Sequence, residues 1–389
     1  MIIRRLLYKK IEPYLNSPEA IVVTGMRRVG KTTLLKDIFE GIETKNKTFL
    51  DLENPLNQKY FEEDNFEKIK RIFEFLGLNF KERIYIFLDE IQLAPKTPQV
   101  VKYFVDHYQV KFFLTGSASL YLKNLFSESL SGRKYVFELF PLTFQEFLEF
   151  KKPSFVVPAE HSQLNQPMIQ TLLECYHEYL EFGGFPQVVL KQSTNEKRQS
   201  LQDIFSSYFQ LEVERLSDFR KTNKLRDLIL LLVQRIGTKL DVNKLATILS
   251  IARQSVYDYL AFLEGTYFIK LIKPFTTNRD VEIKKAPKIY VCDCGLAKVI
   301  SHSSTEALFE QSVFQNLRQK GEVSFYQKKS GAEIDFVLDK KYLYDVKMTP
   351  GKTDYSNLAR LSDELGLESH QIVSLNYSEV EHVIYGFEV

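Results

Sequence analysis

The 389-residue sequence predicts an α/β protein whose first part is a parallel sheet and whose later parts are helical and mixed α/β segments. Runs of apolar and β-branched residues with the length of strands occur at 21–24, 48–52, 84–88 and 111–115. Segments with helical periodicity separate these runs. Parallel neighbours in a sheet need a crossover connection, which is usually a helix, so this alternation is typical of a parallel sheet. The pattern ends near Phe140.

The composition limits the class of protein. Hydrophobic residues make up 44% and charged residues 26% of the chain, as in ordinary soluble proteins, and the length suits about two to four domains. The formal net charge of +2 is too small to indicate a nucleic-acid partner, so any basic surface must be local. The N-terminal residues lack the apolar segment of a signal peptide, and the longest aliphatic run, at 228–233, is far short of the ~20 residues that span a bilayer. We therefore expect a cytoplasmic protein with no membrane partner.

A glycine-rich loop follows the first expected strand. Gly-Met-Arg-Arg-Val-Gly-Lys-Thr at 25–32 matches G-x-x-x-x-G-K-[ST] in every fixed position and directly precedes a helical pattern. The glycines let backbone N–H groups approach phosphates, Lys31 is expected to reach the β- and γ-phosphates, and the Thr32 hydroxyl to coordinate Mg²⁺. The predicted ATP-binding residues in this segment are Gly25, Arg28, Val29, Gly30, Lys31, Thr32 and Thr33.

An apolar strand that ends in an acid is the second element that such a loop needs. Residues 84–88 supply the strand, and Asp89 and Glu90 follow it directly. Asp89 is expected to hold the magnesium ion, and Glu90 to polarise the attacking water, which favours hydrolysis over binding alone. The alternative is an ordinary exposed acidic strand end.

Two further residues are candidates for the same site. Ser117 follows the strand expected at 111–115 and is predicted to sense the γ-phosphate from the strand tip. Arg133, in the sequence Leu-Ser-Gly-Arg, is a candidate catalytic arginine finger that a homo-oligomer would present to a neighbouring site, and an ordinary surface arginine is the alternative. The chain shows no Asn-Lys-x-Asp guanine signature, so ATP is preferred over GTP.

Residues 241–263 have the pattern of two helices joined by a short turn, with Asp241 as the expected N-cap of the first. Two β-rich pieces at 267–270 and 273–275 follow as a candidate wing, so the order resembles a winged helix-turn-helix. Residues 236–290 contain nine Lys/Arg against five Asp/Glu, a local excess of four positive charges. The predicted DNA contacts, at the exposed start of the second helix, are Arg253, Gln254, Ser255 and Tyr257. A packing module between domains is the alternative.

Two carboxylates and a lysine lie on what the sequence predicts to be a β-hairpin. Asp335 begins one strand, and Asp345 and Lys347 are two residues apart on the next, so these two point to the same face. Such a set can bind magnesium and orient water against a phosphodiester, with Lys347 stabilising the charge that develops at phosphorus. Glu310, on an expected amphipathic helix, is a candidate third carboxylate. The arrangement resembles the PD-(D/E)XK nuclease superfamily, with Asp345 where many members carry Glu.

Six segments together resemble the bacterial and archaeal AAA-type P-loop ATPases, in particular those with a C-terminal domain of unknown function. They are Thr24–Thr33, Leu88–Gln92, Leu114–Ser117, Leu130–Arg133, Pro141–Phe147 and Tyr179–Pro186. The resemblance covers nearly the whole chain and implies four domains. These are an AAA-like ATPase core at 1–140, a helical lid at 141–235, a winged helix at 236–288 and a restriction-endonuclease-like, mixed α/β domain at 289–389.

Two functions follow from these motifs. In the first, ATP hydrolysis drives or gates the binding and processing of DNA, and the C-terminal site cuts. In the second, the chain is a regulatory switch whose nucleotide state controls assembly or partner contact, and the C-terminal fold is a binding module that does not cleave. Both require ATP and Mg²⁺ at the glycine loop.

Overall fold

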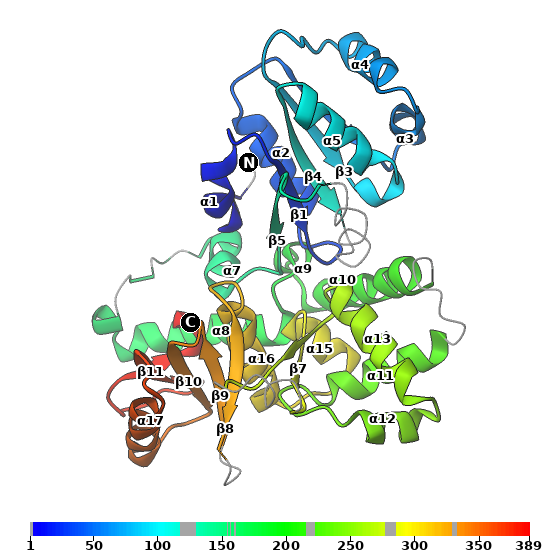
Figure 1. The fold of residues 1–389 in the computed structure, drawn as a ribbon. Helices are drawn as coiled ribbons and strands as arrows, with labels where there is room; N and C mark the ends of the chain where they lie inside the picture. The colour runs from blue at the N-terminus through cyan, green and yellow to red at the C-terminus, as the bar shows by residue number, and fades with distance from the viewer. Residues whose placement is uncertain are drawn as a thin grey trace. The chain divides into compact units, whose positions relative to one another are not determined.

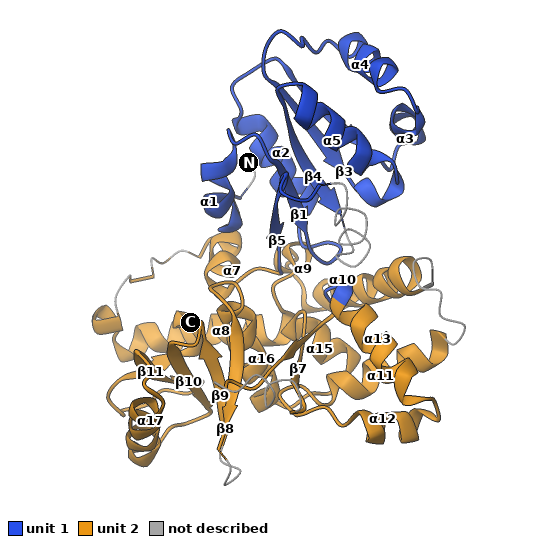
Figure 2. Cartoon of the chain, viewed as in Figure 1, with its two compact units in different colours: residues 1–140, 265–267 blue, residues 141–264, 268–389 orange. Residues whose placement is uncertain are grey.

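The computed structural model describes residues 3–116, 130–153, 155, 157–158, 161–214, 222–276, 285–328 and 333–389 (Figure 1). The chain forms two compact units, namely Met1–Phe140 with Gly265–Tyr267, and Pro141–Glu264 with Phe268–Val389 (Figure 2). The first unit thus ends at the residue where the sequence pattern of the parallel sheet ends. Within the described ranges, no helix is both long enough and apolar enough to cross a membrane.

A five-stranded sheet in the order β2-β3-β4-β1-β5 forms the centre of the first unit (Figure 1). Its strands are β1 (Ala20–Thr24), β2 (Lys47–Asp51), β3 (Ile84–Asp89), β4 (Val110–Gly116) and β5 (Lys134–Glu138). All neighbouring strands are parallel. The four strands that the sequence predicts are therefore confirmed to within one residue at each end, and so is their parallel arrangement.

The sequence does not predict β5, because its apolar run, at 135–137, is only three residues long. Tyr135 and Phe137 lie against the ring of Tyr14, with ring centroids 4.4 and 5.8 Å apart, whereas Val136 between them is 51% exposed. This alternation is what a half-buried strand at the edge of a sheet requires. β5 is such an edge strand, since only β1 pairs with it in the described sheet.

Helices accompany the sheet and supply the other half of its core. In the described residues of the first unit they are α1 (Leu7–Ile11), α2 (Lys31–Gly41), α3 (Pro55–Glu62), α4 (Phe66–Phe75) and α5 (Thr97–His107). Asn54 and Asn65 cap α3 and α4, because each side chain accepts a hydrogen bond from the backbone N–H two residues on. Fully buried rings such as Phe73 and Phe104, whose centroids are 5.2 Å apart, fill the space between these elements. The central strands are thereby held in place.

The second unit begins with a helical part, as the sequence predicts. Its helices are α7 (Phe144–Lys151), α8 (Gln166–Phe182), α9 (Pro186–Val189), α10 (Thr194–Tyr208) and α11 (Thr222–Val233). Capping boxes begin α7 and α10. In the first, the Thr143 hydroxyl accepts from the Glu146 N–H, and the Glu146 carboxylate accepts from the Thr143 N–H. Ser193 and Glu196 repeat this exchange at α10.

Two helices and an antiparallel strand pair follow, namely α12 (Val242–Leu249), α13 (Arg253–Gly265), β6 (Ile269–Ile272) and β7 (Lys288–Val291). Asp241 caps α12 as predicted, by accepting from the Lys244 N–H. The strands differ from the sequence prediction, because β6 begins after Tyr267 and pairs with β7 rather than with the segment at 273–275. The expected domain boundary between 288 and 289 accordingly falls inside β7. Pairing between segments that are distant in sequence leaves no local signal.

A mixed sheet in the order β12-β11-β10-β9-β8 forms the C-terminal part (Figure 1). Its strands are β8 (Val323–Gln327), β9 (Glu333–Leu338), β10 (Tyr342–Lys347), β11 (Ser369–Ser374) and β12 (Val383–Tyr385), and the nearby helices are α15 (Cys294–Ile300), α16 (Thr305–Leu317) and α17 (Lys352–Leu365). β8, β9 and β10 are antiparallel, whereas β10, β11 and β12 are parallel. The predicted hairpin of β9 and β10 is confirmed, since Tyr344 lies opposite Phe336.

A buried carboxylate determines the turn between α8 and α9. Asp293 is fully buried and accepts hydrogen bonds from the Gly184 N–H at 2.7 Å and the Leu296 N–H at 2.9 Å. Gly183 has a φ of 71°, and a Cβ there would lie 1.9 Å from Asp293 Oδ1, so this turn needs glycine. Burial raises the pKa of Asp293 to about 6, although its hydrogen bonds act in the opposite direction.

Asp293→Asn should change how stability depends on pH. A carboxyl whose pKa is raised from 3.8 to about 6 in the folded state binds its proton more tightly there than in the unfolded chain. Its contribution to stability is therefore fully present below the unfolded pKa and is lost as the pH rises through the folded pKa. Between about pH 4 and pH 7, the free energy of unfolding of the wild type relative to Asp293→Asn should fall by up to about 3 kcal/mol. Urea unfolding of both proteins measures this, and a constant difference would contradict the raised pKa.

Candidate nucleotide site and C-terminal carboxylate cluster

The glycine loop connects β1 to α2 at the carboxyl edge of the parallel sheet. Gly30 has a φ of 99°, and Gly25 has a φ of 150°, where a Cβ would lie 2.1 Å from Leu139 O, so both positions need glycine. Arg28, between them, also has a positive φ of 65°. A backbone of mixed handedness can turn successive N–H groups toward an anion, which is the geometry that phosphate binding needs.

Lys31 begins α2 and is almost completely buried. Its ammonium donates to Gly25 O at 2.9 Å and to Met26 O at 3.0 Å, so the side chain folds back over the loop. The positive charge and the amino end of α2 therefore lie together, and both attract phosphate. The predicted ATP-binding residues from Gly25 to Thr33 all belong to this loop and the first turn of α2.

A buried arginine that no sequence motif marks supports the loop. The Arg5 guanidinium donates to Val29 O at 2.7 Å and to Phe140 O at 2.8 Å, and the residue is 5% exposed. It thus connects the loop to the chain that follows β5. Arg5 precedes the loop in a segment without periodicity, so only the folded structure reveals its contacts.

The acid expected after β3 lies beside hydroxyl groups from two other elements. The buried carboxylate of Asp89 accepts a hydrogen bond from the Thr115 hydroxyl in β4, and the Thr32 hydroxyl in α2 lies nearby. Burial raises the pKa of Asp89, and these two hydroxyl groups oppose that effect. The strand order explains the meeting, because β3, β4 and β1 are adjacent and parallel, so their carboxyl ends share one edge.

Hydrogen bonds hold both the backbone and the side chain of Glu90, which follows Asp89. It adopts the left-handed conformation, with a φ of 55°, which costs a non-glycine residue roughly 1 kcal/mol or more. Its backbone N–H donates to Thr115 Oγ1 at 3.1 Å, and its carboxylate accepts a hydrogen bond from Gln92 Nε2. The sequence analysis does not predict Thr115 or Gln92 as site residues, although Thr115 lies in the same strand-end segment as the predicted Ser117.

The residues around Asp89 fit a magnesium ion that accompanies a nucleotide. Thr32 and Asp89 offer a hydroxyl and a carboxylate oxygen that lie near each other. Magnesium takes few protein ligands and completes its shell with water and phosphate oxygens. The described part of the chain agrees with such a sparse site, since it holds no group of three or more His, Cys, Asp or Glu side chains placed to bind a metal ion.

Two further predicted residues belong to other parts of the chain. Ser117 lies outside the described residues. Arg133 directly precedes β5, and its Nε donates to Asp106 Oδ1 at 2.5 Å. Its carbonyl accepts from the N–H of Ala20 at the start of β1, so Arg133 lies at the amino edge of the sheet, opposite the glycine loop. Its role as an arginine finger stays a prediction.

The residues predicted for the C-terminal site come together. Asp335 on β9 accepts a hydrogen bond from the Val346 N–H on β10 at 2.9 Å, and Lys347 Nζ lies 3.0 Å from Asp345 Oδ2. Burial raises the pKa of Asp345, Lys347 opposes this, and the nearby Asp335 adds to the rise. Glu310 on α16 also lies near Asp335, close enough for the charge of Asp335 to raise the pKa of Glu310.

A lysine that the motifs do not mark lies among these carboxylates. The buried Lys288 on β7 has its Nζ 2.6 Å from Glu333, 3.4 Å from Glu310 and 3.4 Å from Asp335. Burial alone would lower the pKa of Lys288, but the carboxylates outweigh it and raise the pKa. Lys239 adds a second ammonium, 2.7 Å from Glu333. Lys288 lies on β7, which is distant from β9 in the sequence, so the sequence gives no sign that the two are partners.

This cluster does not fit a three-carboxylate metal site. Among the described side chains, Glu310, Asp335 and Asp345 do not form a group placed to hold a metal ion. Each already contacts an ammonium, that of Lys288 or of Lys347. With Glu333 and Lys239 included, four carboxylates face three ammonium groups, so little negative charge is left to attract a divalent cation. A metal bound by Asp335 and Asp345 alone stays a prediction.

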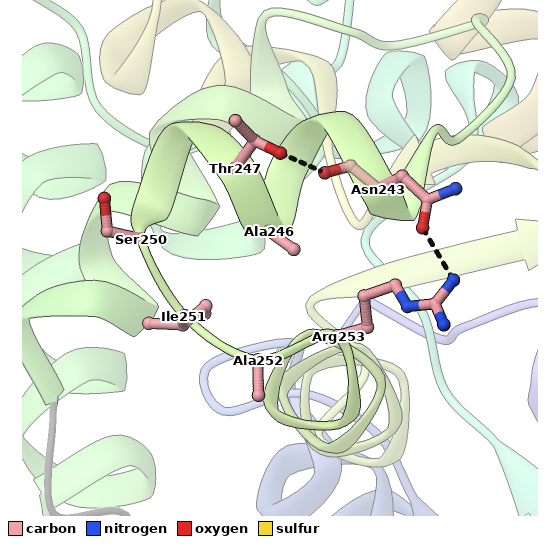
Figure 3. A pocket seen from close by; sticks show the side chains of 7 residues that line it. All are labelled: Asn243, Ala246, Thr247, Ser250, Ile251, Ala252 and Arg253. Carbon is pink, nitrogen blue, oxygen red and sulfur yellow. Dashed lines mark hydrogen bonds between the residues drawn. The ribbon is translucent and has the colours of Figure 1, made fainter.

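The predicted DNA contacts lie on α13. Arg253, Gln254 and Tyr257 are exposed, and Ser255 is half-buried. Arg253 Nη1 donates to Asn243 Oδ1 at 3.0 Å across an open pocket between α12 and α13 (Figure 3). The pocket is lined by Asn243, Ala246, Thr247, Ser250, Ile251, Ala252 and Arg253. Gln254 is tied to the acidic Asp258, to which its Nε2 donates at 2.9 Å.

Comparison with known families accounts for the nucleotide site. Residues 17–148 match the AAA domain family, and this stretch contains the glycine loop, Asp89 and all five strands of the parallel sheet. Residues 17–148 are thus similar to the AAA domain family. A second match, to a domain of unknown function (DUF8612), covers residues 173–307 of the second unit. The AAA domain therefore explains the sheet and the loop, and the second match names no activity.

Similar proteins extend over most of the chain. An uncharacterized protein of Methanocaldococcus jannaschii is 27% identical over 96% of this chain and 86% of its own length. An uncharacterized protein of Haemophilus influenzae is 26% identical over 82% and 79%, respectively. Among solved structures, the Aeropyrum pernix ORC2 protein has 12% identity and a TM-score of 0.43, covering 81% of this chain and 93% of its own. AMPPCP-bound DnaA from Aquifex aeolicus has 14% identity and a TM-score of 0.30, covering 68% and 89%. These TM-scores are too low to support an argument.

Lys288→Met should destabilise the second unit. The variant leaves Glu310, Glu333 and Asp335 partly buried with one ammonium fewer, and loss of one partner from a buried ion pair costs about 3–5 kcal/mol. Thermal unfolding followed by circular dichroism should show a lower midpoint. Millimolar Mn²⁺ should raise the midpoint of the variant but not that of the wild type, because only the variant frees these carboxylates for a cation.

Lys341→Met is the matched control. Lys341 also pairs with a glutamate, Glu368 at 2.8 Å, but its side chain is 53% exposed, so its loss should hardly change the midpoint. If Mn²⁺ raises the midpoint of the wild type and Asp345→Asn abolishes this effect, the cluster is a metal site and our interpretation of Lys288 is wrong.

Proposed function

We propose that this protein is a magnesium-dependent ATPase that binds DNA and couples ATP hydrolysis to DNA binding or remodelling. The observation that carries the ATPase part is the hydrogen bond between Asp89 and Thr115, near Thr32 and the glycine loop, in a segment that matches the AAA domain family. This arrangement brings phosphate-binding, metal-binding and water-activating groups to one edge of the sheet.

The chemistry of hydrolysis divides among the residues at this edge. Lys31 and the loop N–H groups bind the phosphates of ATP, and Thr32 and Asp89 are the residues that would hold magnesium. When bound, magnesium neutralises charge on the β- and γ-phosphates. Glu90 polarises the attacking water, and the bond from its N–H to Thr115 keeps it beside Asp89.

Arg133 supports an oligomeric enzyme. It lies at the amino edge of the sheet, about 16 Å from the glycine loop if measured along the five residues of β1. Its side chain is 38% exposed and is held by Asp106. We therefore propose a homo-oligomer in which Arg133 of one copy completes the nucleotide site of the next, as arginine fingers supplied in trans do.

The segment from α11 to β7 supports a winged helix that contacts DNA. Three helices are followed by the antiparallel pair of β6 and β7, and an isolated bridge joins Lys239 to Lys288, an arrangement that resembles a winged helix. Residues 236–290 carry an excess of four positive charges. The exposed Arg253 guanidinium beside the pocket of Figure 3 suits a DNA phosphate, and Tyr257 on the same helix is 55% exposed.

A second candidate function is favoured by the C-terminal cluster. The mixed sheet with Asp335, Asp345 and Lys347 on adjacent strands supports a PD-(D/E)XK-like fold, but the ammonium of Lys288 favours a domain that binds without cleaving. The protein would then be a switch whose nucleotide state governs assembly or partner contact. Mg²⁺-dependent DNA cleavage that Asp335→Ala or Lys347→Ala abolishes would contradict this second candidate. It requires no cleavage of plasmid, linear or branched DNA and a change in particle size with ATP.

Lys31→Ala and Glu90→Gln should separate ATP binding from hydrolysis. Lys31→Ala removes the ammonium held over the loop, so tight binding is lost. Glu90→Gln keeps the size of the side chain and an oxygen acceptor for Gln92 but removes the base, so ATP still binds while turnover falls at least about 100-fold. A fluorescent ATP analogue measures binding, and phosphate release measures turnover.

Glu82→Gln is the control for this pair, since Glu82 is an exposed glutamate just before β3, at the far end of that strand from Asp89. It should leave both quantities unchanged. Equal turnover in the wild type and in Glu90→Gln would remove Glu90 from the catalytic role.

Arg253→Ala should weaken DNA binding and make it less sensitive to salt. Loss of one phosphate contact reduces the slope of log K against log salt concentration by about 1. Fluorescence anisotropy with a labelled duplex at several salt concentrations measures affinity and slope together. Arg360→Ala is the matched control, because Arg360 on α17 is 69% exposed and lies outside the proposed winged helix. Unchanged affinity and slope in Arg253→Ala would show that DNA does not bind at α13.

A further inference from the structure

The last residue of α13 and the two residues that follow it belong to the first unit. The chain leaves the second unit after Glu264, contributes Gly265–Tyr267 to the first unit and returns at Phe268 (Figure 2). Within the first unit, the hydroxyl of Tyr267 lies 2.6 Å from Thr24 Oγ1 and 3.1 Å from Glu138 Oε1. A phenol has one proton, which goes to the Glu138 carboxylate, so the Thr24 hydroxyl is the donor in the shorter bond.

These two partners lie where the glycine loop begins. Thr24 is the last residue of β1, and Gly25 follows it directly. Glu138 is the last residue of β5 and lies opposite Thr24 in the parallel pairing of the two strands. Thr24 is 2% and Tyr267 is 6% exposed, so the bond between their hydroxyl groups is buried, whereas Glu138 is exposed. Tyr267 therefore joins the ends of β1 and β5 at the base of the phosphate-binding loop.

The backbone of Tyr267 is at the same time part of the C-terminal cap of α13. The Phe268 N–H donates to Leu263 O at 2.9 Å, and Tyr267 has a φ of 64°. This is the pattern of a Schellman motif, in which the residue in the left-handed conformation is usually glycine. A bulky residue there costs about 1–2 kcal/mol in backbone energy. The tyrosine is thus kept at a strained position, and its hydrogen bonds to Thr24 on β1 and Glu138 on β5 offset that cost.

We propose that Tyr267 is a positioning residue that links the glycine loop to α13. ATP in the loop and DNA at the start of α13 would then change each other's affinity. Phosphate binding acts on the loop that begins at Thr24, Thr24 holds the Tyr267 hydroxyl, and the Tyr267 backbone ends a helix that runs about 20 Å to Arg253. A rigid helix can carry a small displacement at its end along its whole length. The inference rests on the proposed ATP and DNA binding.

Tyr267→Phe tests this link, because it removes the hydroxyl and keeps the ring. The parent protein is Glu90→Gln, in which ATP is bound and not consumed. The affinity for a fluorescent ATP analogue is measured with and without a saturating DNA duplex, and the ratio of the two affinities gives the coupling factor. By linkage, ATP changes the affinity for DNA by the same factor. We expect a factor of about five or more in the parent and a factor of 1 in Tyr267→Phe.

Tyr176→Phe is the matched control. The Tyr176 hydroxyl is also buried and lies 2.6 Å from a hydroxyl, that of Ser312, so both variants lose the same kind of bond and comparable stability. A merely structural role of Tyr267 predicts that both variants keep the coupling factor. Thr24→Val removes the same bond from the other side, and the double variant should show no further loss of coupling than either single variant.

A coupling factor in Tyr267→Phe equal to that of the parent overturns the inference, as does a factor of 1 in the parent. If the parent binds no ATP or no DNA, the proposed function itself is refuted. This outcome is measured in the parent alone, which carries no substitution at Tyr267. Loss of coupling in Tyr267→Phe and Thr24→Val, with Tyr176→Phe unchanged, supports the link.

Discussion

The parallel alignment of β1, β3 and β4 is the constraint on which the nucleotide site depends. Parallel strands end at the same edge of a sheet, so the loop after β1, Asp89 in β3 and Thr115 in β4 meet although they are distant in sequence. Buried side chains on these three strands keep the edge in register. A slip of one residue in β4 would place Leu114 or Gly116 beside Asp89 and leave its buried carboxylate without the threonine hydroxyl.

In the second unit, buried charged residues are the constraint on how the elements pack. Lys288 and Asp293 lie in one short stretch that contains β7 and the start of α15, and each has several partners. An unpaired charge is costly in a low-dielectric interior, so each of these residues restricts where its partners can lie. Lys288 connects β7 with α16 and β9, and Asp293 connects α15 with the turn before α9. This stretch of chain thereby orients much of the unit.

Tyr267 also has two structural roles. Its backbone ends α13, and its hydroxyl contacts the strand before the glycine loop. In our proposal, this residue lets the glycine loop respond to what α13 binds. The place of Arg133 at the amino edge of the sheet led us to propose a contact with another copy of the chain. Both proposals connect the glycine loop to events away from the nucleotide.

The sequence by itself determined the local parts of this protein. The loop from Gly25 to Thr33, the acids after β3 and the β9–β10 hairpin follow from spacing, because each is contained within a few neighbouring residues. Only the tertiary structure placed Lys288 among the carboxylates, Thr115 at Asp89 and Tyr267 in a left-handed turn where the sequence predicts a strand. Steric and periodic preferences act between neighbours along the chain, whereas burial and hydrogen bonding of a side chain depend on which distant segments pack around it.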